Sequence, residues 1–334
     1  MKQLLPILFI ALSFSACTKS RTYFPKNIEP QPVEIVRFDN ALLNINAQTA
    51  LQDIRIIANE YPTFFPFFVE NILGISANDT AFLVEQLPRF LEDTIYGFKQ
   101  TNERERILFA STHDLELGLS QAFARVHYLY PELPIPTIYL FISGFNASIL
   151  FVDDDIAVGA DMYLGSDYEY YNRVVHDYQK VTMRKECIPV DVVSAHLFRY
   201  LPYTSTKSRL IDNMIYRGKI MYLLAQIFSD TPNYEVMGYT KDQWAWCSKH
   251  ERAIWNLMMD KKDLFKTESL LLTSYLNEGP FTGEISQDSP GRLGTWIGWR
   301  IAESYMNHHP EITIQQLIAE PDAERILQES FYRP

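Results

Sequence analysis

Apolar residues recur at helical spacing over most of the chain, and a stretch near the C-terminus shows this pattern most clearly. Within residues 289–306, an apolar side chain occupies every fourth position from Leu293 onward, as expected for one face of an α-helix. Gly294 and Gly298 are also four residues apart and leave a bare strip on that helix. We predict a helix over residues 291–308 that another element or a ligand can approach closely along its glycine strip.

Amphipathic periodicity predicts further helices on both sides of a short β-rich region. The Asn-Asp-Thr sequence at residues 78–80 supplies a good N-cap for one of them. The predicted helices span residues 40–60, 64–72, 80–99, 102–129, 168–185, 189–200, 207–228, 241–259, 264–275, 314–320 and 323–330.

Period-two alternation of apolar residues predicts a small sheet between these groups of helices. The predicted strands cover residues 34–38, 137–143, 148–152 and 156–160. Asp153-Asp154-Asp155 separates the last two strands, which predicts a hairpin with an acidic turn. Such a turn suits either solvent or a calcium ion, and it lacks the spacing of an EF-hand loop.

The order of helices, a small sheet and helices again is typical of an α+β protein. No linker interrupts residues 36–334. We therefore predict a mostly helical single domain over residues 34–334 with a small antiparallel or mixed sheet.

The N-terminus has the pattern of an export signal. Lys2 precedes an apolar run over residues 4–14 that is too short for a stable membrane span. The sequence Ser15-Ala16-Cys17 then resembles a bacterial lipobox, although Phe14 stands where leucine is usual. An ordinary cleaved signal with a chance cysteine is the alternative.

On the lipoprotein interpretation, residues 1–16 are a signal peptide and Cys17 becomes the acylated N-terminus. Several acyl chains on one residue anchor a protein stably, whereas a single chain does not. The polar, proline-bearing residues 17–33 are then a lipid-anchored tether. Thr18, which is not aspartate, fits delivery to the outer membrane.

Composition and charge exclude some classes of protein. Hydrophobic residues make up 47% of the chain, and 21 phenylalanines and 20 tyrosines against 13 glycines favour a helix-rich globule. The formal net charge is −11, so the chain is a poor candidate for binding nucleic acid. We expect no nucleic acid among its partners.

The chain lacks the common catalytic motifs. Its only His-Glu pair, His250-Glu251, has Ile254 where a zinc peptidase places its second histidine. Nucleophile elbows and phosphate-binding loops are absent as well. We predict no catalytic residue, no metal and no cofactor, although the many acidic residues leave a catalytic carboxylate pair open. Cys187 and Cys247 either form a disulfide or remain buried thiols.

Several segments in combination resemble the GldB family, the gliding-motility lipoproteins of Bacteroidetes. They are residues 214–222, 239–255, 289–306 and 330–334, and the lipobox lies at the other end of the chain. The resemblance implies a lipid-anchored protein of the cell envelope, at the outer membrane and facing the periplasm. It also implies a non-catalytic component of, or accessory to, the gliding-motility and secretion machinery, whose partners are the membrane and unidentified envelope proteins.

The succession of strand, hairpin and helix is similar to a zinc-peptidase-like scaffold without its metal motif. With the resemblance to GldB, this motivates the hypothesis that one cleft binds protein partners or peptides. The residues expected to line it are Tyr216, Lys219, Arg292, Trp296 and Arg300. The plainer interpretation is that Tyr216 and Lys219 lie on a solvated helix face. On the same interpretation, Arg292, Trp296 and Arg300 belong to a well-packed C-terminal helix.

The alternative function is a degenerate or non-standard metallopeptidase-like hydrolase of the periplasm. A cluster of His, Asp and Glu side chains around His196, on the predicted helix 189–200, would support it. A lone histidine on such a helix is otherwise a structural residue.

Overall fold

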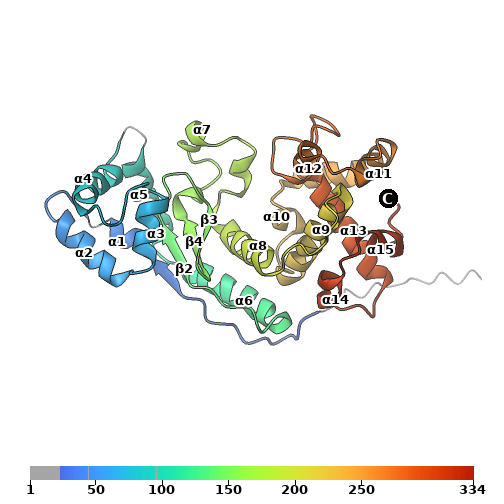
Figure 1. The fold of residues 1–334 in the computed structure, drawn as a ribbon, viewed down its shortest axis with the longest axis horizontal. Coiled ribbons are helices and arrows are strands. Elements are labelled where there is room, and N and C mark those ends of the chain that lie inside the picture. Colours follow the sequence, from blue (N-terminus) through green and yellow to red (C-terminus); the bar gives the residue numbers. More distant parts are fainter. Residues whose placement is uncertain (1–22, 44, 95–96) are drawn as a thin grey trace, which may run out of the picture.

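The structure, a computed structural model, describes residues 23–43, 45–94 and 97–334. Within these ranges the chain forms a mostly helical α+β fold with a small mixed sheet, which confirms the predicted class (Figure 1). The predicted signal peptide, Cys17 and residues 18–22 of the tether lie outside the described residues. Among the described helices, none combines the length and the apolar character needed to cross a bilayer.

The helices carry the labels of Figure 1. They are α1 (Phe38–Leu42), α2 (Ala50–Glu60), α3 (Phe64–Asn71), α4 (Thr80–Leu91), α5 (Phe98–Leu108), α6 (His113–Leu129), α7 (Tyr171–Val174), α8 (Ile188–Tyr200), α9 (Leu210–Ile227), α10 (Asn233–Val236), α11 (Lys241–Asp260), α12 (Ser269–Leu276), α13 (Leu293–His308), α14 (Ile314–Ala319) and α15 (Ala323–Glu329).

The sheet holds β1 (Ile35–Arg37), β2 (Ile138–Phe141), β3 (Ile149–Val152) and β4 (Asp155–Gly159), in the spatial order β1-β2-β4-β3. Strands β1, β2 and β4 run parallel, and β3 pairs antiparallel with β4. The predicted hairpin is therefore confirmed. At its tip Asp153 has a φ of 53°, and Asp154 accepts a hydrogen bond from Tyr200.

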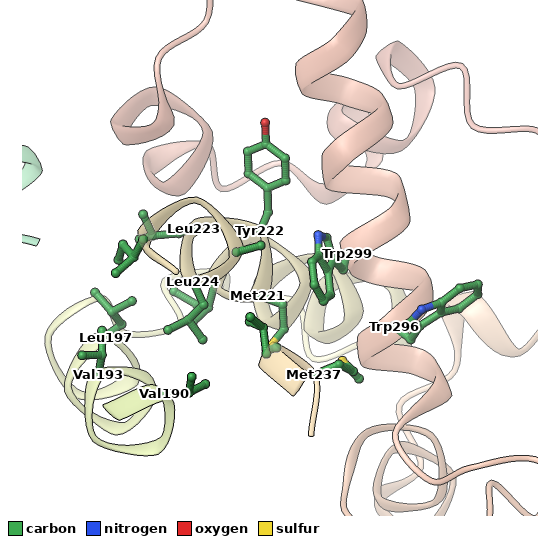
Figure 2. Close-up of a cluster of buried hydrophobic side chains, with 14 of the residues drawn as sticks. Val190, Val193, Leu197, Met221, Tyr222, Leu223, Leu224, Met237, Trp296 and Trp299 are labelled. Atoms are coloured by element: carbon green, nitrogen blue, oxygen red, sulfur yellow. The ribbon is translucent and has the colours of Figure 1, made fainter. Parts of the chain in front are cut away.

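The two faces of the sheet pack into separate cores, because successive side chains of a strand point to opposite faces. On β2, Ile138 and Leu140 join a large core with α6, α8, α9 and α13. Phe141 joins a smaller, aromatic core with α1 to α4. Figure 1 accordingly shows α1 to α4 at one end of the molecule and α9 to α15 at the other. Figure 2 shows part of the large core, with Val193 and Leu197 of α8 facing Leu224 of α9.

Helices α9 and α13 cross at two glycines. A Cβ atom at Gly298 would lie 1.8 Å from the carbonyl oxygen of Met214, and one at Gly218 would lie 2.0 Å from the carbonyl carbon of Gly298. Gly294 is also close to other backbone, since a Cβ atom there would lie 2.9 Å from the carbonyl oxygen of Tyr275. The predicted glycine strip is thus confirmed, and it faces α9 and the end of α12.

One predicted helix, over residues 40–60, is wrong because its middle forms a turn. Helix α1 ends at Leu42 and α2 begins at Ala50. Between them the side-chain oxygen of Asn46 accepts hydrogen bonds from the backbone N–H groups of Gln48 and Thr49. These bonds replace the backbone hydrogen bonds of a continuous helix, so the chain changes direction before α2 begins.

The predicted helix over residues 168–185 is also wrong. Only α7 and short 3-10 turns occur there. This segment forms hydrogen bonds instead with residues just after the sheet. The carbonyl oxygen of Met183 accepts from the N–H group of Gly165. The Tyr171 hydroxyl donates to the carbonyl oxygen of Asp161 and accepts from the N–H group of Leu164. Tertiary hydrogen bonds therefore override the helical pattern of the sequence.

The predicted helix over residues 102–129 is divided as well, into α5 and α6. The side chain of Lys185 donates hydrogen bonds to the carbonyl oxygens of Leu108 and Ser111, at 3.1 and 2.8 Å. A distant lysine thus satisfies the carbonyl groups that the break exposes.

Residues 23–33, the described part of the predicted tether, lie along the globule. The hydroxyl groups of Tyr23 and of Tyr222 in α9 are 2.6 Å apart, and the ring of Phe24 packs edge-on against Tyr128 of α6. Val33 is buried in the large core. Figure 1 shows this segment running past α6 toward β1.

Cys187 and Cys247 are both buried and both free. The structure therefore contains the buried thiols that the sequence left open as one alternative. Burial raises the pKa of the Cys187 thiol to about 11, so the thiol stays protonated at neutral pH.

We expect Gly298→Ala to lower the free energy of unfolding by roughly 3 kcal/mol or more, because the added methyl group collides with the backbone of α9. Urea unfolding followed by circular dichroism measures the change. Gly118→Ala in α6 is the matched control: its methyl group would meet only Pro189, at 3.6 Å, so helix propensity should raise stability by up to about 1 kcal/mol. Equal stability of both variants would contradict the close crossing.

Candidate functional site

A polar cavity of about 490 Å³ opens between α8, α9, α10 and the beginning of α13. This volume is within the range of roughly 300–1,000 Å³ that is usual for small-ligand sites. Its charged lining residues come from distant parts of the chain: Asp191, Arg217, Glu235, Glu278 and Arg292. Valine, phenylalanine and methionine side chains complete the wall. We treat this cavity, called the arginine cavity below, as the candidate functional site.

The close helix crossing positions both arginines. Arg217 precedes Gly218, one of the α9 residues whose backbone lies against α13. Arg292 is the N-cap residue of α13, and its φ of 62° turns the chain sharply into the helix. Both side chains therefore leave the crossing at the same cavity.

Arg217 is held by neutral groups. Its Nη1 donates to the carbonyl oxygen of Leu276 at 2.7 Å, and its Nη2 donates to the side-chain oxygen of Asn277 at 3.2 Å. Within the described part of the chain Arg217 forms no ion pair. Burial first, and then the positive charge of Arg292, lower the pKa of Arg217. The cavity thus contains a guanidinium charge that no carboxylate of the described chain balances directly.

Arg292 makes one ion pair, from Nη1 to Glu278 at 3.2 Å. The side chain of Glu278 is 62% exposed, so this pair contributes little to stability. A ligand anion can therefore replace Glu278 on Arg292 at small energetic cost.

Asp191 of α8 also lines the cavity, together with Tyr163. The Tyr163 hydroxyl donates to Asp191 Oδ2 at 2.9 Å. Burial raises the pKa of Asp191 to about 7, against the opposing effect of the Tyr163 hydrogen bond. Near neutral pH this carboxyl group therefore exists in both protonation states, and it can accept or donate a hydrogen bond.

The structure divides the predicted cleft residues among different sites. Tyr216 and Lys219 line a separate, small cavity of about 30 Å³. There Lys219 Nζ donates to the carbonyl oxygens of Ile318 and Glu320, at 3.0 and 2.8 Å, which binds α9 to the end of α14. Burial lowers the pKa of Lys219 to about 8. The side chains point to this side because residues 216 and 219 share one face of α9, whereas Arg217 lies about 100° further round the helix.

Trp296 and Arg300 do not line the arginine cavity either. Trp296 is 1% exposed and packs edge-on against Trp244 of α11. Its neighbour on α13, Trp299, extends toward Met221 of α9 (Figure 2). Arg300 pairs with Glu251 at 3.0 Å and with Glu303, so it joins α13 to α11. Of the five residues predicted for one cleft, only Arg292 lines the arginine cavity.

His196 lies in the large core, and neither ring nitrogen has a hydrogen-bond partner among the described residues. Its ring packs edge-on against Phe123 and near Tyr200. The described ranges contain no group of three or more His, Cys, Asp or Glu side chains arranged to hold a metal. The ligand cluster expected around His196 on the hydrolase alternative does not occur there.

Sequence reasoning missed the residues that make the cavity polar. Asp191 lies on a helix that was correctly predicted, and its only signal is a carboxylate within an apolar run. Tyr163 and Glu278 lie outside helices and strands, where periodicity carries no information. Arg217 directly follows Tyr216 in the sequence, but the different direction of its side chain depends on the side of α9 that meets α13.

A second cluster of charged groups is buried at the carboxyl ends of the parallel strands. Asp39 pairs with Arg37 at 2.6 Å, and Asp161 accepts hydrogen bonds from the backbone N–H groups of Ser143 and Phe145, at 2.8 and 2.7 Å. Glu105 of α5 is fully buried beside them. Burial first, and then the charges of Asp39 and Asp161, raise the pKa of Glu105 well above its usual range.

Fold and cavity define a mostly helical α+β protein with an open cavity that is lined by charged residues. The family model for gliding motility protein GldB matches residues 22–334, so the chain belongs to the GldB family. The resemblance seen in the sequence is thereby confirmed, and membership implies a gliding-motility lipoprotein. No curated protein and no solved structure matches the chain. The expected similarity to a zinc-peptidase scaffold therefore stays a prediction.

We expect the stability of the protein to fall on acidification because of His196. Burial lowers its folded-state pKa to about 4 from an ordinary value near 6.5. The unfolded chain therefore takes up the proton first, and stability is lost as the pH falls from about 6.5 toward 4. In the wild-type protein this loss of the free energy of unfolding should be on the order of 2–3 kcal/mol, and the His196→Leu variant should lack it. Urea unfolding at several pH values measures both proteins.

The control for this measurement is His308→Leu, since His308 lies exposed at the end of α13. Its stability difference from the wild type should change much less between pH 7 and pH 4. If the stability difference between His196→Leu and the wild type were the same at pH 7 and at pH 4, a neutral, unpartnered histidine would be contradicted.

Glu105→Gln should stabilise the protein at neutral pH by about 1–3 kcal/mol. The raised pKa means that the folded state favours the protonated carboxyl, so stability is lost as the pH rises above the ordinary glutamate value of about 4.3. The gain from the substitution should therefore shrink toward pH 4, as followed by thermal melting. Glu103→Gln, at an exposed position of the same helix, is the control with little expected effect. A destabilised Glu105→Gln protein at pH 7 would show that an ionised Glu105 is favourable.

Proposed function

We propose that this chain is a non-catalytic component of, or accessory to, the gliding-motility and secretion machinery, and that the arginine cavity binds its partner or ligand. The observation that carries this proposal is the convergence of Arg217 and Arg292 on one open cavity, together with membership of the GldB family. The partner protein belongs to the envelope in this proposal.

The same proposal places the protein at the outer membrane, on the periplasmic side, through acyl chains on Cys17. Five residues lie between Cys17 and Tyr23 in the sequence, and the Tyr23 hydroxyl is hydrogen-bonded to Tyr222 of α9. An extended chain of this length spans at most about 20 Å. An anchor at Cys17 would therefore keep the globule near the bilayer, with the region around Tyr222 toward the membrane.

We expect Cys17→Ala to abolish labelling by an alkyne analogue of palmitate and to remove the protein from the membrane fraction. The thiol of Cys17 is the acylation point in the proposal, and no second anchor is part of it. Cys187→Ala is the matched control, because Cys187 is buried and free, and this variant should be labelled like the wild type. Labelling of Cys17→Ala at the wild-type level would overturn the anchor.

The role of the cavity is tested in a bacterium that carries this chain. Arg217→Gln combined with Arg292→Gln should reduce colony spreading or protein secretion severalfold at an unchanged amount of membrane-bound protein. Exposed arginines of α5 supply the control, Arg104→Gln combined with Arg106→Gln, which should behave like the wild type. Wild-type spreading and secretion in the cavity variant would overturn the proposed function.

A further inference from the structure

We propose that the arginine cavity binds the carboxylate group of its ligand between the guanidinium groups of Arg217 and Arg292. This inference rests on the proposed function, since it names the chemistry of the ligand in the same cavity. Two sources supply that chemistry: the C-terminus of a peptide chain and a small free acid.

The first argument is the supply of donors. Arg217 has only neutral acceptors, and Arg292 has one weak, exposed ion pair. Guanidinium groups present several N–H donors in a planar fork that matches a carboxylate. The two side chains come from α9 and from the beginning of α13, and they leave donors for an incoming anion.

The second argument is the contrast with other partly buried arginines of the same chain. Arg209 binds Asp212 through two nitrogen atoms and binds Glu324 as well. Arg37 binds Asp39 in the same way. Arg217 has no such partner in the described chain, and the charge of Arg292 lowers its pKa further. A carboxylate from outside would supply the counter-charge that the fold gives to Arg209 and Arg37.

The third argument selects a monoanion over a phosphate. The cavity wall also carries Glu235, Glu278 and Asp191, whose carboxyl groups offset the two arginine charges. A phosphate group carries close to two negative charges at neutral pH, and its repulsion from these carboxylates is correspondingly larger. A single carboxylate can replace Glu278 on Arg292 without adding a second charge.

The fourth argument concerns the size and the remaining wall of the cavity. A volume of about 490 Å³ suits the end of a chain or a small molecule better than a long extended segment. Apolar side chains of Phe198 and Met221 lie beside the polar groups, so they can pack against the carbon skeleton that bears the carboxylate. The Tyr163–Asp191 pair can then hydrogen-bond an amide or hydroxyl group of the ligand.

The test is protection of the arginines from phenylglyoxal, which modifies free guanidinium groups. The full mature chain in detergent is treated with the reagent, and the modification rate of each arginine is read by mass spectrometry. The probes are a pool of random acetylated tripeptides with free carboxylates, the same pool as C-terminal amides, acetate, succinate and inorganic phosphate. Arg104, exposed on α5, is the internal control.

We expect the free-acid pool at millimolar concentration to slow modification of Arg217 and Arg292 severalfold and to leave Arg104 unchanged. The amide pool should give no protection. Protection by the acid pool well beyond that of acetate and succinate identifies a peptide C-terminus as the source, and equal protection by the small acids identifies a free acid. Equal protection by acid and amide pools, stronger protection by phosphate, or no protection at all would overturn the inference.

Variants supply an independent readout by calorimetric titration of the free-acid pool. Arg217→Gln should weaken binding at least severalfold at an unchanged melting temperature, and Arg217→Lys should retain part of it because the charge remains. Unchanged binding by Arg217→Gln would also overturn the inference. The proposed role in motility is judged separately, by the spreading and secretion of the variant that combines Arg217→Gln and Arg292→Gln. If that variant loses spreading or secretion while the wild-type protein binds no carboxylate, only the carboxylate inference is rejected.

Discussion

The backbone contact between Gly218 and Gly298 is the constraint on which the rest of the C-terminal half depends. Only residues without a Cβ atom let α9 and α13 approach so closely. The crossing fixes which side of α9 faces α13, and it sets Arg217 and Arg292 at the edge of the same cavity. A geometric requirement of packing thus also determines the chemistry of the binding site.

The charges of the arginine cavity differ from those of two well-paired arginines in the same chain. Arg37 is paired with Asp39, and Arg209 is paired with Asp212. In the arginine cavity, Arg217 binds only neutral oxygens and Asp191 is divided between two protonation states near pH 7. Imperfectly balanced charges at an open cavity cost stability, and their retention is expected where a ligand completes them.

Much of the fold was predictable because long amphipathic helices and alternating strands carry strong periodic signals. The predictions for α8, α9, α11 and α13 and for the β3–β4 hairpin agree with the structure. The segment 168–185 was not predictable, because its hydrogen bonds go to residues after the sheet and not to its own neighbours. Similarly, the turn at Asn46 depends on one side chain that competes with the helix backbone.

The sequence by itself determined the α+β class, because that class depends on local periodicity. It also determined the membership of the GldB family, which depends on specific segments, and the glycine strip that α9 approaches, which depends on residue size. Tertiary structure alone decided which polar residues meet. Tyr216 and Arg217 are adjacent in sequence, yet one faces α14 and the other the arginine cavity, since each residue of a helix turns by about 100°. Arg292, Asp191 and Glu278 join Arg217 only because the crossing of α9 and α13 brings distant segments together.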